Sequence, residues 1–198
     1  MIATSLAAAQ SISLPGDIEV NVREHLRFIT AAHAAGVQVL VFPELSLTGY
    51  ELPLLQRCLL HPGEERFASA GTTGSGLLRL GADTVAQAIC ADITHAQHPA
   101  QAAAAGASLY LAGVLESEAG YRADAAAMQR YAQQHTMGML LANHGGPSGG
   151  YVPAGRSAFW APGGALVVAA PGAGSWLVVA SKPRTTDHIQ WTGEAMRL

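Results

Sequence analysis

The sequence predicts one α/β domain, in which strands and helices alternate. Short apolar runs of strand length alternate with longer segments of helical periodicity. The runs at 37–42 and 109–114 are continuously apolar, which is typical of strands buried on both faces of a sheet. No internal repeat or low-complexity linker divides the 198 residues, which suffice for one core. We therefore expect a single domain over residues 1–198.

The N-terminal elements have clear boundaries. Residues 2–9 are small and apolar, and they predict a strand rather than a signal peptide, because no basic region or cleavage site accompanies them. Asp17 is a plausible N-cap for a helix with apolar residues at helical spacing. Gly36 ends that helix as a C′ glycine, and residues 37–42 form the next strand.

The later elements continue the alternation. Helices are expected at 99–105 and 121–135. The remaining strands are expected at 84–90, 109–114, 139–142, 157–160, 165–169 and 176–180. The turns "APGG" and "APGAG" separate the last three strands. The tail after Lys182 is polar, and we expect it to be extended or bound to a partner.

Composition excludes several classes of partner. Hydrophobic residues make up 49% of the chain and charged residues 13%, which argues against disorder. The net charge of −3, without a basic patch, argues against nucleic acid. Pro171 and two glycines interrupt the longest apolar tract, so it cannot cross a membrane as one helix. Two cysteines do not suggest a disulfide framework or a zinc ribbon. A cytoplasmic location is expected.

Two reactive side chains follow predicted strands. Glu44 comes two residues after the strand at 37–42, and Cys90 ends the strand at 84–90. Functional groups gather at the carboxyl ends of strands in open α/β sheets. A desolvated carboxylate can take the proton of a cysteine nucleophile, and a nearby cation can stabilise the resulting oxyanion. Each residue alone has a plainer interpretation, since such a cysteine is usually a small core residue and such a glutamate a solvated or capping one.

Four segments, in order, resemble the nitrilase, or carbon–nitrogen hydrolase, superfamily. The first segment, at 16–52, contains "FPELSLTGY", which is highly specific to that family. The others are "HPGEERFASAG" at 61–71, "AICADITHAQHPAQAAAAGASLYLAGVL" at 88–115 and "LLANHGGPSGGYVPAGRSAFWAPGGALV" at 140–167. The resemblance covers nearly the whole chain.

The resemblance implies an α-β-β-α sandwich and a Glu–Lys–Cys triad. Glu44 matches the general base and Cys90 the nucleophile, while Glu65 matches an assisting glutamate eight residues after the lysine. The backbone N–H of Ala91 is expected to contribute to an oxyanion hole. The resemblance also implies a small-molecule substrate, a homodimer, and no metal or organic cofactor.

The chain departs from the family pattern in two places. In "RCLLHPGEE", at 57–65, Arg57 stands where the family has its lysine, and Cys58 stands where it has glutamine. Arginine does not readily shed a proton and needs more room than lysine. Arg57 comes only thirteen positions after Glu44, so a helix and two strands of the family are expected to be missing. Lys182 is too distant in sequence to be expected to replace the lysine, and Cys58 is expected to be structural.

Other polar residues have two interpretations each. One interpretation of His95 and His98 is that they contact substrate or bind metal, and the other is that they lie at the surface or cap a helix. The surface or capping role is favoured, because no acidic or cysteine cluster completes a metal site. Asn143 would orient substrate or cap a turn. Tyr50 would line the pocket or pack in the core.

Three functions are compatible with these residues. The first is an amidase-like hydrolase that attacks a small amide, carbamoyl or nitrile carbon through a Cys90 thioester, with Arg57 in the lysine position. The second is a catalytically impaired or inactive paralogue that serves as a binding or assembly subunit. The third is acyl transfer to an amine in place of water.

Overall fold

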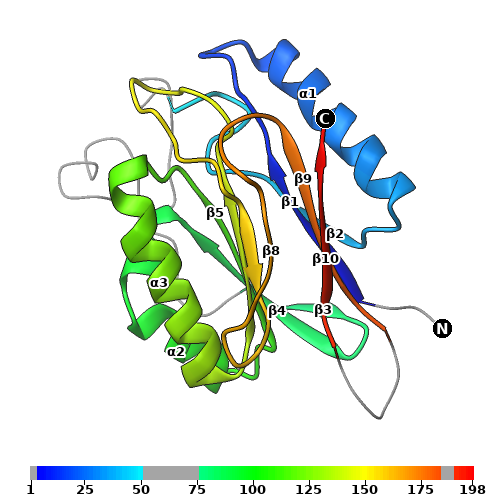
Figure 1. The fold of residues 1–198 in the computed structure, drawn as a ribbon, viewed down its shortest axis with the longest axis vertical. Helices are drawn as coiled ribbons and strands as arrows, with labels where there is room; N and C mark the ends of the chain where they lie inside the picture. Colours follow the sequence, from blue (N-terminus) through cyan, green and yellow to red (C-terminus); the bar gives the residue numbers. More distant parts are fainter. Residues whose placement is uncertain (1–3, 51–75, 184–189) are drawn as a thin grey trace.

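The computed structural model describes residues 4–50, 76–183 and 190–198. Two sheets pack face to face, with α1 (Ile18–Ala34) outside one sheet, and α2 (Gln97–Ala104) and α3 (Glu118–His135) outside the other (Figure 1). The predicted α/β class and α-β-β-α sandwich are confirmed. The helix and two strands expected to be missing would follow Glu44, and residues 51–57 of that interval lie outside the described residues.

The first sheet contains both ends of the described chain. Its strands are β1 (Thr4–Gln10), β2 (Val39–Val41), β9 (Trp176–Lys182) and β10 (Thr192–Arg197), in the order β10-β9-β1-β2. β1 and β2 are parallel and the other pairs are antiparallel. The expected extended tail is therefore β10, which completes this sheet by pairing with β9.

The termini of α1 follow the sequence prediction. The Asp17 side chain accepts a hydrogen bond from the Val20 N–H at 3.0 Å, which satisfies one of the free donors of the first turn. Gly36 has φ +69°, and its N–H donates to the His33 carbonyl. α1 thus stops sharply, and the chain returns directly into β2.

The prediction for β2 is wrong in length and burial. A strand buried on both faces was expected over 37–42, but β2 has three residues, all partly buried. Within the described residues it is the last strand of its sheet, with β1 on one side. Its continuous apolar sequence reflects packing on both faces, since Leu40 packs towards α1 and Val39 and Val41 pack between the sheets.

The second sheet holds most of the core. Its strands are β3 (Leu78–Leu80), β4 (Asp83–Ile89), β5 (Leu109–Val114), β6 (Gly138–Asn143), β7 (Ala158–Trp160) and β8 (Leu166–Ala169), in chain order across the sheet. β4, β5 and β6 are parallel, so their carboxyl ends lie at one edge. A short 3₁₀ helix, η3 (Cys90–Thr94), follows β4 at this edge.

Alternating side chains separate the layers. In β1, Leu6 and Ala8 point between the sheets, whereas Ala7 and Ala9 point towards α1. In β5, Leu111 lies between the sheets and Tyr110 lies under α2 and α3. This alternation fixes the register of each strand, because a slip by one residue would exchange its two faces.

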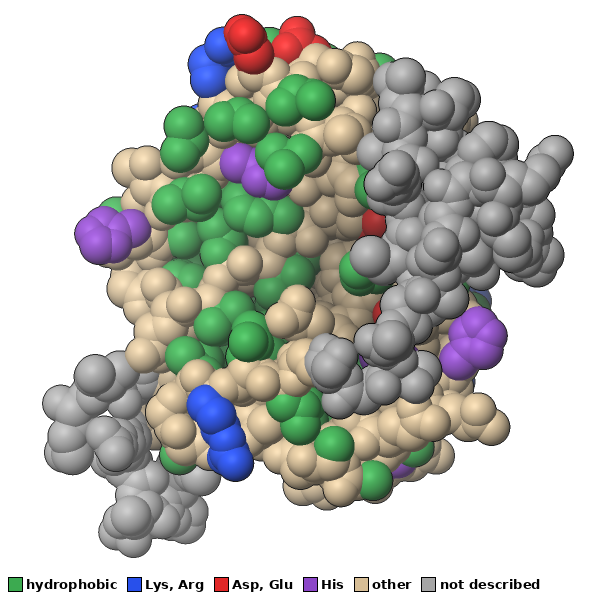
Figure 2. Space-filling model, turned by 180° about the vertical axis from the view of Figure 1, so that it is seen from behind, with side chains coloured by type: hydrophobic (Ala, Val, Ile, Leu, Met, Phe, Trp, Pro, Cys, Tyr) green, Lys and Arg blue, Asp and Glu red, His purple; other side chains and the backbone are tan. Residues whose placement is uncertain are grey.

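One face of α1 remains exposed. Four apolar side chains on this face are 39–55% exposed, and α1 borders the hydrophobic surface seen in Figure 2. They are Ile18, Val22, Leu26 and Ile29. Among the described residues, no helix combines the length and apolar character needed to cross a membrane.

Candidate active site

Glu44 is held where the two sheets meet. Gly113 of β5 lies directly under the 42–44 turn, because a Cβ at that position would be 2.5 Å from the Phe42 carbonyl oxygen. Leu45 adopts a left-handed backbone with φ +55°, which is rare for a residue of this kind. The Glu44 side chain is buried, with 8% exposure of the residue.

Cys90 begins η3 in a similarly unusual conformation. Its φ is +43°, in the left-handed region. Asp92 fixes the entry into the turn, since its carboxylate accepts the Ile89 N–H at 2.9 Å. The residue is 9% exposed. Such strain in a buried reactive residue must be maintained by its surroundings and is frequent at functional sites.

The Cys90 thiol interacts directly with Glu44. Burial raises the pKa of the thiol, and the negative charge and side-chain hydrogen bond of Glu44 raise it further. The charge of Glu116 acts in the same direction, whereas a hydrogen bond from the Leu115 N–H acts against it. The thiol is therefore protonated at neutral pH and donates its hydrogen to the Glu44 carboxylate.

A second pair of carboxyl groups lies close to this site. Glu116 hydrogen-bonds to Asp124 of α3, and burial together with that bond and the charges of Asp124 and Glu44 raises its pKa to about 8. At neutral pH, Glu116 consequently holds a proton, which prevents the repulsion of neighbouring carboxylates. Glu116 thus lies next to Glu44 and Cys90 as a neutral acid.

Asn143 positions the main chain around Glu116. It is completely buried, and its Oδ1 accepts hydrogen bonds from the N–H groups of Glu116 and His144. Its Nδ2 donates to the carbonyls of Glu116 and Gly155. This uses the donors and acceptors of the amide fully. Of the two alternatives for Asn143, the geometry supports main-chain capping rather than contact with substrate.

Ala91 and Tyr50 lie beside these residues. Ala91 directly follows Cys90 in η3 and is partly buried, so its predicted contribution to an oxyanion hole stays a prediction. Tyr50 is 8% exposed, and its ring stacks edge to face on Tyr151 at 5.6 Å. The Tyr50 N–H donates to Ser148 Oγ at 2.8 Å. These contacts fit the packing alternative for Tyr50.

The two histidines after Cys90 make local contacts. His95 Nδ1 donates to the Ala91 carbonyl at 2.8 Å, and His98 Nδ1 hydrogen-bonds to the Tyr110 hydroxyl at 2.7 Å. In the described part of the chain, no group of three acidic, histidine or cysteine side chains could hold a metal ion. The favoured alternative, surface and capping roles, fits this geometry.

Arg57, Glu65 and Cys58 lie outside the described residues. Lys182 is described and is ion-paired to Asp83 at 2.7 Å, at the start of β4. Cys90 follows the other end of β4, roughly 23 Å away at about 3.3 Å per residue. Lys182 therefore cannot take the place of a lysine at Cys90, as expected from the sequence.

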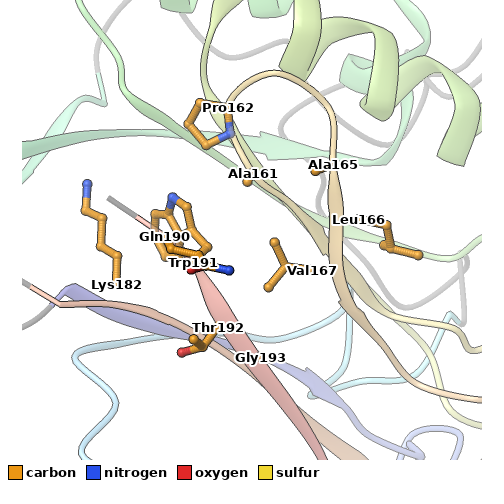
Figure 3. Close-up of a pocket in the computed structure, with 10 residues that line it drawn as sticks. All are labelled: Ala161, Pro162, Ala165, Leu166, Val167, Lys182, Gln190, Trp191, Thr192 and Gly193. Atoms are coloured by element: carbon orange, nitrogen blue, oxygen red, sulfur yellow. The ribbon is translucent and has the colours of Figure 1, made fainter. Parts of the chain in front are cut away.

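Lys182 instead lines a surface pocket that is separate from the candidate site. This cavity of about 580 Å³ lies beside β8 and β10, and Lys182 and Trp191 contribute to its lining (Figure 3). The Lys182 ammonium is 5.2 Å from the centre of the Trp191 ring. Because Asp83 and Trp191 both hold Lys182, its charge is satisfied within the fold.

Comparison with known proteins supports the resemblance seen in the sequence. The carbon–nitrogen hydrolase family model matches residues 5–80. No curated protein matches the chain. Among solved structures, a glutamate-to-leucine mutant of the amidase from Nesterenkonia sp. AN1 is 20% identical, with a TM-score of 0.84 over 91% of this chain and 90% of that one. Its active-site cysteine carries the acetamide moiety of fluoroacetamide.

Two further structures of the same amidase agree. A cysteine-to-alanine mutant in complex with butyramide is 19% identical, with a TM-score of 0.83 over 91% of both chains. The NitN amidase after tag removal is 20% identical, with a TM-score of 0.81 over 91% of this chain and 93% of that one. The chain has the carbon–nitrogen hydrolase fold. The family match over residues 5–80 agrees with this fold and supports the predicted resemblance to a shortened member of that superfamily.

Several residues of the candidate site were not predicted. Leu115 and Glu116 follow β5 at the same edge as Cys90, so the strand-end argument that found Glu44 could also have found them. Asp124 and His144 carried no comparable signal. Asp124 is one of many polar residues of α3, and the contact made by His144 joins positions 100 residues apart.

Proposed function

We propose that the chain is an amidase-like carbon–nitrogen hydrolase that acts on a small amide, carbamoyl or nitrile substrate. The observation that carries this proposal is the buried hydrogen bond from the Cys90 thiol to the Glu44 carboxylate. A nucleophile and a base in contact are what acyl transfer requires. The amidase fold of the relatives from Nesterenkonia, and the amides at their site, support an amide substrate.

In the first half-reaction, Cys90 Sγ attacks the amide carbon while its proton passes to Glu44. The carbonyl oxygen becomes an oxyanion, for which the Ala91 N–H and Arg57 are the proposed donors. The carbon–nitrogen bond then breaks, and the proton held by Glu44 passes to the leaving nitrogen. This leaves a thioester on Cys90 and a free amine or ammonia.

In the second half-reaction, water attacks the thioester carbon and Glu44 accepts one of its protons. The carbon–sulfur bond breaks, the acid leaves, and Cys90 recovers its proton. Glu65 is proposed to support Glu44. None of these steps needs a metal or an organic cofactor. An amine in place of water would give acyl transfer through the same residues.

Alkylation of Cys90 tests the role of Glu44. Iodoacetamide is an amide of acetamide size, and its reaction with Cys90 releases the thiol proton. If Glu44 accepts that proton, Glu44→Gln will slow alkylation by at least tenfold at pH 7. If Glu44 merely raises the pKa of the thiol, Glu44→Gln will accelerate alkylation, since more thiolate will be present. Cys58→Ser provides a background with one reactive thiol.

Turnover is tested by the release of ammonia. We expect hydrolysis of acetamide or butyramide, abolished by Cys90→Ala and strongly reduced by Glu44→Gln. Fast alkylation of Cys90 without release of ammonia would indicate that the thiol is activated but that turnover of the amide does not occur. Slow labelling, equal at Cys90 and Cys58, would contradict the proposal.

The second candidate is an inactive paralogue that serves as a binding or assembly subunit. The presence of Arg57 in the lysine position favours it. So does the charge around Cys90, because the described charge that acts on the thiol at neutral pH, that of Glu44, is negative. This candidate predicts binding of small amides, detectable by calorimetry, without release of ammonia.

The proposed partners follow the same family argument. We propose a small-molecule substrate and a homo-oligomer in the cytoplasm, with no nucleic acid or membrane partner. Light scattering at several concentrations tests the oligomeric state. A monomeric mass at every concentration would contradict it.

A further inference from the structure

His144 joins the two halves of the candidate site. It follows β6 and is completely buried. Its Nε2 lies 2.6 Å from the main-chain carbonyl oxygen of Glu44. A carbonyl can only accept, so Nε2 carries the hydrogen and donates it. This bond connects the carboxyl end of β6 in one sheet to the turn after β2 in the other.

The imidazole is neutral in this position. Burial lowers the pKa of His144, and the hydrogen bond to Glu44 only partly opposes this effect. With the hydrogen on Nε2, Nδ1 is left as a buried acceptor, and within the described residues it has no hydrogen-bond partner. A neutral donor fixes the Glu44 main chain without placing a positive charge beside the Glu44 carboxylate. The basicity of that carboxylate is therefore not reduced.

His144 is itself held on both sides. Its own N–H donates to Asn143 Oδ1 at 2.9 Å, and the next N–H, of Gly145, donates to the Ser11 carbonyl at 2.8 Å. The 42–45 turn, by contrast, combines a left-handed Leu45 with a close approach to Gly113. A strained turn keeps its conformation only when its surroundings hold it.

We propose that His144 is a positioning residue, which holds the Glu44 main chain so that the carboxylate meets the Cys90 thiol. His144 does not touch the reacting atoms, and it acts through Glu44. The inference rests on the proposed function, in which Glu44 is the base. It adds that the base is set from the opposite sheet, through a side chain that the family resemblance did not single out.

Substitutions at position 144 distinguish the effect of the hydrogen bond to Glu44 from the effect of side-chain volume. In His144→Gln the amide nitrogen can occupy the place of Nε2 and donate to Glu44. His144→Phe keeps a ring of similar size but has no donor. His144→Asn keeps a donor that is too short to reach. We therefore expect the glutamine variant to remain active, and the other two to lose the contact.

The experiment measures iodoacetamide alkylation of Cys90 in the Cys58→Ser background, with circular dichroism to establish folding. His144→Phe and His144→Asn should slow alkylation by about tenfold, as expected for one lost hydrogen bond. His144→Gln should stay within about threefold of the parent. In a Glu44→Gln background, His144→Phe should have no further effect, because a residue that acts through Glu44 has nothing left to position.

Three results would overturn the inference. They are an unchanged rate in His144→Phe or His144→Asn, a His144→Gln variant as slow as these two, and an equal loss in the parent and Glu44→Gln backgrounds. If His144→Phe does not fold, the alkylation rates of His144→Asn and His144→Gln test the inference. If Glu44→Gln alone does not slow alkylation, the proposed role of Glu44 fails, whatever the variants at position 144 do.

Discussion

Cys90 and Glu44 share a hydrogen bond although they follow strands of different sheets. Cys90 follows β4 of the six-stranded sheet, and Glu44 follows β2 of the four-stranded sheet. The contact therefore depends on how the two sheets pack. A change in the sheet interface that moves the 42–44 turn should therefore disturb the site.

Gly113→Ala tests this dependence. A Cβ at this position would be 2.5 Å from the Phe42 carbonyl, so the 42–44 turn must move away from β5. We expect a loss of about 1–3 kcal/mol in the free energy of unfolding, measured in urea, and slower alkylation of Cys90. Gly172→Ala is the matched control, because its Cβ would meet nothing within 4 Å. Equal effects of the two substitutions would argue against a specific contact.

Glu116→Gln tests the acid pair through the pH dependence of stability. The folded-state pKa of Glu116, about 8, lies above its ordinary value of 4.5. Between these values the folded state holds a proton that the unfolded state has lost, so this group makes stability fall as pH rises from about 4.5 to 8. Glutamine can still donate to Asp124 but does not titrate.

Urea unfolding at several pH values measures this effect. The parent should lose stability between pH 5 and 8 more steeply than the Glu116→Gln variant. Asp17→Asn is a suitable comparison at a carboxylate on the surface. Parallel pH profiles for the parent and the Glu116→Gln variant would show that Glu116 is ionised in the folded protein.

The ion pair of Lys182 and Asp83 should contribute to stability but not to the site. Its atoms are 2.7 Å apart, and the side chains are 20% and 6% exposed. Lys182→Met leaves the Asp83 carboxylate buried without its cation, so a loss of about 3 kcal/mol is expected in urea unfolding. Arg23→Met, at an exposed pair with Glu19, should change stability by less than about 0.5 kcal/mol.

Low pH should remove the contribution of the Lys182–Asp83 ion pair to the free energy of unfolding. Burial alone would raise the pKa of Asp83, but hydrogen bonds from Lys182, Thr4 and Ser108 outweigh it and lower the pKa below 3.8. The contribution is therefore present above the unfolded pKa and is lost as pH falls through the folded one. Cys90 alkylation should be unchanged in Lys182→Met. A slower reaction would indicate a link between the two ends of β4.

Elements with local signals could be predicted from the sequence. Asp17 and Gly36 mark the ends of α1 by capping chemistry that needs no tertiary contact. β5 is continuously apolar and was predicted with its observed bounds. β3 was missed, since a three-residue strand at a sheet edge, exposed at two of its positions, carries little periodicity.

The residues of the candidate site also divide into those with a local sequence signal and those without one. Glu44 and Cys90 were identified because each follows a strand and lies in a recognisable motif. Glu116 was missed, because "ESE" after β5 resembles a solvated run, and only the fold brings it to Asp124. The role of His144 depends on a main-chain carbonyl from another sheet, which no local pattern encodes.

Arg57→Lys tests whether the departure from the family pattern limits activity. Arginine in the lysine position supplies a positive charge, but its planar head is broader and it retains its proton. If the lysine contributes one transition-state contact, restoring it should raise the rate of ammonia release from acetamide by about 100-fold, or about 3 kcal/mol. Arg57→Met should remove whatever activity the arginine supports.

The three residues at position 57 distinguish the two candidate functions. An active hydrolase adapted to arginine should be fastest with Arg57 and slower with lysine or methionine. An impaired paralogue should gain ammonia release only with lysine. If all three proteins release ammonia equally, residue 57 does not contact the oxyanion, and the match to the family's lysine is wrong. Arg156→Lys, at an exposed ion pair with Glu118, is the control for a general effect of exchanging arginine for lysine.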